Sequence, residues 1–161
     1  MHPPLPPPYQ DLAERVFRVN SAEAFNALAL DLFRLHAVHN PVYRGFLKGL
    51  GTKVETVERV TEIPCLPIGL FRNHRVLLEG LESTITFTSS GTTGTVTSSH
   101  HVPWPSLYER SFLRSFEAVY GSVTEWRILA LLPAYLERSG SSLVYMAEQL
   151  IARSGDPLSG T

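Results

Sequence analysis

The chain has 161 residues, of which 43% are hydrophobic and 18% charged, and its net charge is −1. This composition suits one packed domain or part of one, and it excludes the basic surface that nucleic acids or anionic membranes require. The single cysteine, Cys65, excludes an intrachain disulfide and a cysteine-rich metal site. The N-terminus lacks a signal-peptide pattern, and the longest apolar run (27–38) is too short and too charged to span a bilayer. We therefore expect a cytoplasmic protein without a membrane span.

The N-terminal third is expected to be a Pro-rich tail followed by a small helical layer. Residues 1–10 form the tail, in which residues 3–8 favour polyproline II, either as a solvated segment or as an SH3-type ligand. A short helix is predicted over 11–19, and Ser21 is expected to cap a second one. The apolar stripe predicted on that second helix comprises Phe25, Leu28, Ala29, Leu32 and Leu35.

A third helix is predicted from Asn40-Pro41 to Gly51, with Val42, Phe46 and Leu50 facing inward. Two prolines in the following stretch (62–71) exclude a regular strand or helix there. Cys65 lies within this stretch, and we interpret it as a buried small hydrophobe rather than a nucleophile. Residues 75–78 are expected to form a strand.

The remainder alternates between predicted strands and helices. Strands are expected at 83–88, with Ile85 and Phe87 on one face, and at 98–102, and a third, buried on both faces, at 126–132. A helix is predicted over 105–120, and another from a cap at Ser141 or Ser142 to Arg153. The inward residues predicted for these two helices are Tyr108, Phe112, Phe116, Val119, Leu143, Met146, Ala147, Leu150 and Ile151. The pattern predicts an α/β fold, in which a helical layer precedes a partial mixed or parallel sheet with flanking helices.

A loop rich in serine, threonine and glycine follows the strand expected at 83–88. Residues 88–95 contain six hydroxyl side chains, two glycines and no charge. Glycines let the backbone approach a ligand closely, and consecutive N–H groups can then converge on one anion. Composition alone leaves two interpretations open, a phosphate-binding loop and a flexible surface loop. The P-loop spacing, the dinucleotide fingerprint and the nucleophile elbow do not occur here.

The segment Phe87-Thr88-Ser89-Ser90-Gly91-Thr92-Thr93-Gly94 resembles the phosphate loop of adenylate-forming enzymes. Its surroundings resemble the LuxE-type acyl-protein synthetases, which are related to phenylacetate-CoA ligases. The matching stretches are Ile63-Pro64-Cys65-Leu66-Pro67-Ile68-Gly69-Leu70-Phe71, Ser98-Ser99-His100-His101-Val102, Leu107-Tyr108-Glu109-Arg110-Ser111-Phe112 and 129–146, all in the expected order. The resemblance implies that residues 11–161 are the N-terminal portion of an adenylate-forming domain, with downstream motifs expected beyond Thr161.

The resemblance also implies an activity. A carboxylic acid, a fatty acid in the luciferase-associated members, is activated by ATP with Mg²⁺ as an acyl-adenylate and passed to a thiol or to an acceptor protein. The residues that would hold the ATP phosphates are Ser89, Ser90, Gly91, Thr92, Thr93, Gly94 and Thr95. His100 would contact a phosphate or the carboxylate, as the candidate catalytic residue. His101 falls on the opposite face of a strand.

Several alternatives stay open at this point. Tyr135, Arg138 and Ser141 are candidates for a substrate-pocket wall, or else belong to a surface pair at Glu137–Arg138 and an ordinary helix cap. His36 and His39 are three residues apart on a predicted helix, but they lack a third metal ligand, so we interpret them as surface or capping residues. The whole chain could also be a truncated, non-catalytic nucleotide- or partner-binding remnant, or, less in keeping with its motifs, a serine hydrolase that uses His100.

Overall fold

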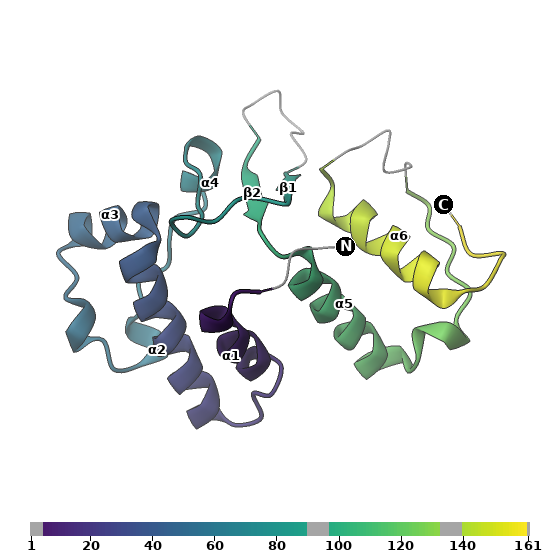
Figure 1. The fold of residues 1–161 in the computed structure, drawn as a ribbon, viewed down its shortest axis with the longest axis horizontal. Helices are drawn as coiled ribbons and strands as arrows, with labels where there is room; N and C mark the ends of the chain where they lie inside the picture. Colours follow the sequence, from purple (N-terminus) through teal and green to yellow (C-terminus); the bar gives the residue numbers. More distant parts are fainter. Residues whose placement is uncertain (1–4, 90–96, 133–139, 161) are drawn as a thin grey trace.

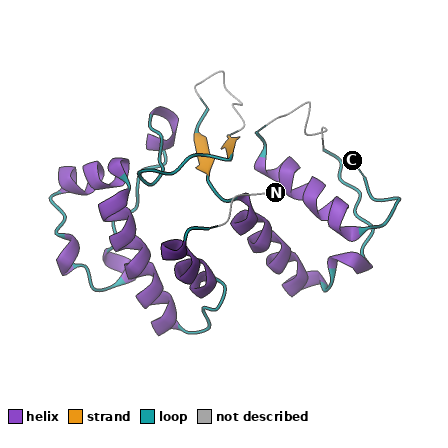
Figure 2. Cartoon of the chain, viewed as in Figure 1, coloured by secondary structure: helices purple, strands orange, loops and turns teal. Residues whose placement is uncertain are grey.

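The computed structural model describes residues 5–89, 97–132 and 140–160. Two groups of helices lie on either side of a short two-stranded sheet (Figure 1). Helices α1 (Pro7–Val16), α2 (Ala22–His39) and α3 (Pro41–Leu50) form the first group, and α5 (Pro105–Tyr120) and α6 (Ser142–Ser154) form the second. Figure 2 shows that helix dominates the described chain, which is a mixed α/β arrangement with little sheet.

Local signals set most of the helix ends. The Ser21 hydroxyl accepts a hydrogen bond from the Ala24 N–H, and the Asn40 side chain accepts one from the Tyr43 N–H, as the capping prediction requires. Gly51 ends α3 in the left-handed conformation, at φ 68°. The N-terminal tail is shorter than predicted, because α1 begins at Pro7 rather than at Asp11. Proline suits this first helical position, since its missing N–H would have no partner within the helix.

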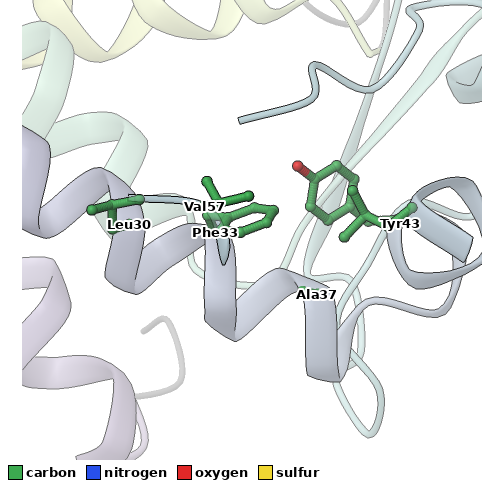
Figure 3. Close-up of a cluster of buried hydrophobic side chains, with 6 residues drawn as sticks. Leu30, Phe33, Ala37, Tyr43 and Val57 are labelled. Atoms are coloured by element: carbon green, nitrogen blue, oxygen red, sulfur yellow. The ribbon is translucent and has the colours of Figure 1, made fainter. Parts of the chain in front are cut away.

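The predicted inward faces of α2 and α3 are correct only in part: Leu28 is buried and Phe46 packs against the core, whereas most of the other predicted positions are half-buried or exposed. In α2 the buried residues are Leu28, Leu30, Phe33 and Ala37, whereas Phe25 is 53% exposed. In α3 they are Tyr43 and Leu47, and Leu50 is exposed. The reason is that α2 packs against both α1 and α3, so its burial is spread around the helix instead of along one stripe. Figure 3 shows part of the resulting core, with Leu30, Phe33, Ala37, Tyr43 and Val57 in one cluster.

The segment between the helical layer and the sheet is irregular, as the prolines predict. It contains one short α-helix, α4 (Leu70–Asn73), and two single-turn 3-10 helices, η1 (Val54–Thr56) and η2 (Val60–Glu62). The strand predicted at 75–78 is wrong, because these residues have no strand pairing in the structure. The prediction for Cys65 is also wrong, since its side chain is exposed. Cys65 lies between two prolines and outside any helix or strand, so no regular element directs its side chain toward the core.

Strands β1 (Ile85–Thr88) and β2 (Ser99–Val102) lie close to their predicted positions and pair antiparallel. Phe87 opposes His100, and Thr86 opposes His101. The third predicted strand is wrong, because residues 126–132 form only an isolated parallel bridge between Leu129 and Gly160. Among the described residues the sheet therefore has two antiparallel strands, in place of the mixed or parallel sheet that we expected.

The second helical group packs around Phe112, Val123 and Leu150. Ser141 caps α6 by accepting a hydrogen bond from the Val144 N–H, as predicted. Two residues predicted to face inward, Val119 and Leu143, are instead exposed. Val119 lies near the end of α5, and in α6 the neighbouring Val144 takes the buried position, with 2% of its surface exposed. In the part of the chain described, no helix is both long and apolar enough to cross a membrane.

Candidate functional site

Three of the predicted site residues lie within the described part of the chain: Ser89, His100 and Ser141. The others lie outside the described residues, and they are Ser90, Gly91, Thr92, Thr93, Gly94, Thr95, Tyr135 and Arg138. The site is therefore built from the residues at the base of the glycine loop and from the elements around them.

Two hydrogen bonds hold the ends of the glycine loop together. The Ser89 N–H donates to the Ser98 carbonyl oxygen at 3.0 Å, and the Ser98 N–H donates to the Ser89 hydroxyl oxygen at 3.0 Å. Ser98 is 7% exposed, whereas Ser89 is exposed, so the pairing is partly buried. Beyond it, β1 and β2 run antiparallel from the two ends of the loop. Ser89 and Ser98 are thus held together at one point.

The start of α6 lies against the same point. The Thr88 N–H donates to the Gly140 carbonyl oxygen at 2.8 Å, and Gly140 immediately precedes the capping residue Ser141. Gly140 adopts φ +87°, and a Cβ atom there would lie 2.9 Å from the Thr88 hydroxyl oxygen. The glycine is required both by its backbone conformation and by the close approach of β1. The end of β1 and the residue before the cap of α6 are therefore neighbours in the fold.

The first turn of α6 is further fixed by α5. The Tyr108 hydroxyl donates to the Ser142 carbonyl oxygen at 3.1 Å. The ring of Tyr108 stacks on Tyr145 and meets the edge of Phe87, which is buried on β1. This aromatic contact joins α5, α6 and β1 beneath the base of the loop. A helix N-terminus held in this way presents N–H groups and a partial positive charge, both of which favour an anion such as phosphate.

His100 lies on β2, two residues beyond the base of the loop. Its ring stacks on Phe71 with the ring centroids 4.8 Å apart, and its Nε2 atom is 3.5 Å from the Ser98 hydroxyl oxygen. The side chain of His101 has a different partner, since its Nδ1 atom lies 3.1 Å from the Thr86 hydroxyl oxygen. The two histidines thus have separate surroundings, in keeping with the alternation expected along a strand.

The sequence reasoning missed three residues that shape this site. Gly140 precedes a predicted helix cap, and a glycine before a cap is a signal that could have been read. Ser98 was assigned to a strand, although its position at the far end of a glycine loop suggested a closing role. The contact of Phe71 with His100 joins positions 29 residues apart and could not be found from local patterns.

No group of three or more potential metal-binding side chains occurs in ranges 5–89, 97–132 and 140–160. Comparison with known proteins yields no family model, no curated protein and no solved structure that matches this chain. The likeness to acyl-protein synthetases therefore rests on the sequence motifs quoted above.

Proposed function

We propose that this chain supplies the phosphate-binding part of an ATP-dependent, acyl-adenylate-forming ligase of the acyl-protein synthetase type. The observation that carries the proposal is the contact between Thr88 and Gly140, which places the N-terminus of α6 beside the base of the glycine loop. Loop N–H groups and hydroxyls from one side and the helix N-terminus from the other would then face the same phosphates. We further propose a cytoplasmic location for this activity.

In the proposed reaction a carboxylate oxygen attacks the α-phosphorus of ATP. The bond from that phosphorus to the bridging oxygen of the β-phosphate breaks, so pyrophosphate leaves and an acyl-adenylate remains. The substrate is a carboxylic acid, proposed to be a fatty acid. A thiol or an acceptor protein then takes the acyl group, and AMP leaves as the bond from the acyl carbon to the AMP oxygen breaks. Mg²⁺ would enter with ATP and offset the charge of the phosphates. Hydrogen bonds from the loop would stabilise the leaving pyrophosphate, at about 1.5–3 kcal/mol for each bond to a charged group.

His100 is proposed to donate a hydrogen bond to a phosphate or to the attacking carboxylate. Phe71 stacks against the ring and limits its rotation, and the Ser98 hydroxyl lies at one ring nitrogen. A serine hydrolase that pairs Ser98 with His100 is a weaker interpretation, because Ser98 is buried and its N–H is used to close the loop.

The test compares the adjacent residues His100 and His101 in ATP–pyrophosphate exchange. We expect His100→Ala to lower the exchange rate at least tenfold with the acid that supports it, whereas His101→Ala leaves that rate within twofold. Exchange that is independent of every carboxylic acid tested would overturn the proposal. Calorimetry with Mg–ATP on the 161-residue chain tests nucleotide binding by itself, and exchange catalysed by this chain alone would exclude a non-catalytic remnant.

A further inference from the structure

An apolar pocket of about 280 Å³ lies in the N-terminal helical layer, between α2, α3 and the irregular segment that follows them. Its volume is close to the lower end of small-molecule sites, about 300 Å³. None of the side chains that line it carries a formal charge when histidine is neutral. They are Ala29, Leu32, Phe33, His36, Asn40, Tyr43, Ile63, Leu66, Phe71 and Val76. Phe33 and Tyr43 belong to the core cluster drawn in Figure 3, so the pocket is built on a fixed surface.

The polar side chains of this pocket are His36, the buried Asn40 and Tyr43, whose hydroxyl donates to the Pro64 carbonyl oxygen at 2.7 Å. Asn40 is 2% exposed; its side-chain oxygen accepts from the Tyr43 N–H at 3.2 Å, and its side-chain nitrogen lies 3.4 Å from His36 Nδ1. Since an amide nitrogen can only donate, Nδ1 of His36 is the acceptor and Nε2 carries the proton. Burial lowers the pKa of His36, which favours this neutral form. Within the described residues, the Nε2 proton has no hydrogen-bond partner.

This arrangement differs from the sequence interpretation of His36 as a surface or capping residue. The side chain is partly buried and faces a space lined almost entirely by carbon. Because no buried side-chain polar atom of the described residues lacks a partner, Nε2 of His36 is reached by solvent, and a ligand acceptor would take the place of water there. A charged ligand would lose its hydration without gaining a counter-charge from the lining.

We propose that this pocket binds an uncharged, mainly apolar small molecule, whose single hydrogen-bond acceptor pairs with Nε2 of His36. The molecule would lie between α2 and the segment 63–76, with the ring of Phe71 forming part of the wall. The same ring stacks on His100, so the pocket borders the candidate site without using the glycine loop. This binding site is independent of the proposed ligase activity.

The first test uses the full 161-residue chain labelled with ¹⁵N at histidine. We expect 2-octanone, which is uncharged and has one carbonyl acceptor, to shift the His36 Nε2 resonance saturably. Octanoate at pH 7 has a similar chain but carries a charge, and it should bind at least tenfold more weakly. The absence of a saturable shift up to the solubility limit of 2-octanone, or equal binding of octanoate, would overturn the proposal.

The second test fills the pocket. Ala29→Phe is expected to weaken 2-octanone binding at least tenfold. The matched control is Ala13→Phe, because Ala13 lines a separate pocket of about 200 Å³ on the α1 side, which also includes His36. Loss of binding in the Ala13 variant alone would assign the ligand to that other pocket and contradict the proposal. If circular dichroism shows that Ala29→Phe does not fold, Val76→Phe fills the same space from the irregular segment.

One variant distinguishes failure of the pocket proposal from failure of the proposed ligase function. A glycine-loop variant, Gly91→Val, is expected to abolish Mg–ATP binding and to leave the 2-octanone titration unchanged. Coupled loss of both ligands in a folded Gly91→Val protein would show that the pocket depends on the loop, against the independence proposed here.

Discussion

Gly140 is the residue at which backbone conformation and packing are most tightly linked. It has φ +87°, and an added Cβ atom would lie 2.9 Å from the Thr88 hydroxyl oxygen. We predict that Gly140→Ala lowers the free energy of unfolding by about 1–3 kcal/mol, measured by urea denaturation. Gly155→Ala is the matched control, because Gly155 also has positive φ (+65°) but nothing lies within 4 Å of its added Cβ. Equal losses in the two variants would show that the Thr88 contact contributes nothing.

His36 should make stability depend on pH in a defined window. Burial lowers its pKa from the ordinary value of 6.5, so the unfolded chain takes up a proton at a higher pH than the folded chain. The free energy of unfolding is therefore expected to fall as the pH drops from about 7 through 6.5, by at most about 1.4 kcal/mol per pH unit for one proton. The free energy of unfolding stops falling once the pH is below the pKa of His36 in the folded state.

Thermal unfolding of His36→Gln between pH 7 and 5 provides the measurement. The variant should lose this part of the pH dependence, whereas the same substitution at exposed His39 should retain it. The carboxylates whose pKa is lowered, such as Glu14, Glu62 and Glu79, contribute stability that is lost at lower pH, below about 4.5. Unchanged pH dependence in His36→Gln would contradict the assignment.

At the scale of elements, the sequence predicted helix ends better than helix faces. Ser21, Asn40, Gly51 and Ser141 act on the backbone within one turn, so their effect can be read locally. A buried face depends on which neighbours a helix has. The inward position of Leu47 in place of Leu50, for example, follows from how α3 meets α2. For the candidate site, the same limit explains why the loop was predicted but its contact with Gly140 was not.

The cap of α6 connects helix stability with the proposed function. Ser141→Ala removes a side-chain acceptor for the Val144 N–H, and we predict a loss of about 1 kcal/mol in unfolding free energy. Ser21→Ala removes the equivalent cap of α2 and should cost a similar amount. Calorimetry should then show weaker Mg–ATP binding for Ser141→Ala only, since the contact of Thr88 with Gly140 joins the start of α6 to the end of β1. Equal Mg–ATP affinities in the two variants would show that the N-terminus of α6 does not contribute to phosphate binding.

At the scale of the whole molecule, the two helical groups are joined by side chains as well as by the chain itself. Arg110 of α5 donates to both carboxylate oxygens of Glu14 on α1, at 2.5 and 3.1 Å, and its guanidinium lies 4.1 Å from the centre of the Phe17 ring. The pair of Arg110 and Glu14 spans 96 positions in sequence, and no local pattern predicts it. They fix α1 relative to α5 and so limit how the helical layer moves against the candidate site.

The segment 126–132 gives the clearest test of the arrangement as a whole. Its apolar run predicted a strand buried on both faces, yet Leu129 and Leu131 are 74% and 103% exposed, while Ile128 packs against the core of the second helical group. We predict that Leu131→Ala changes the unfolding free energy by no more than about 0.5 kcal/mol, as at other exposed sites. Ile128→Ala should cost roughly 2 kcal/mol, because it removes packed methyl groups.

Urea denaturation of the two variants at several protein concentrations distinguishes the two structures of this segment. A large, concentration-independent cost for Leu131→Ala would mean that the side chain is buried within the chain, as the apolar run predicted. A cost that grows with protein concentration would place Leu131 between two copies of the chain, because association stabilises only the folded state that presents the contact. With neither effect, Ile128 contributes to folding and Leu131 adds nothing to the stability of this chain.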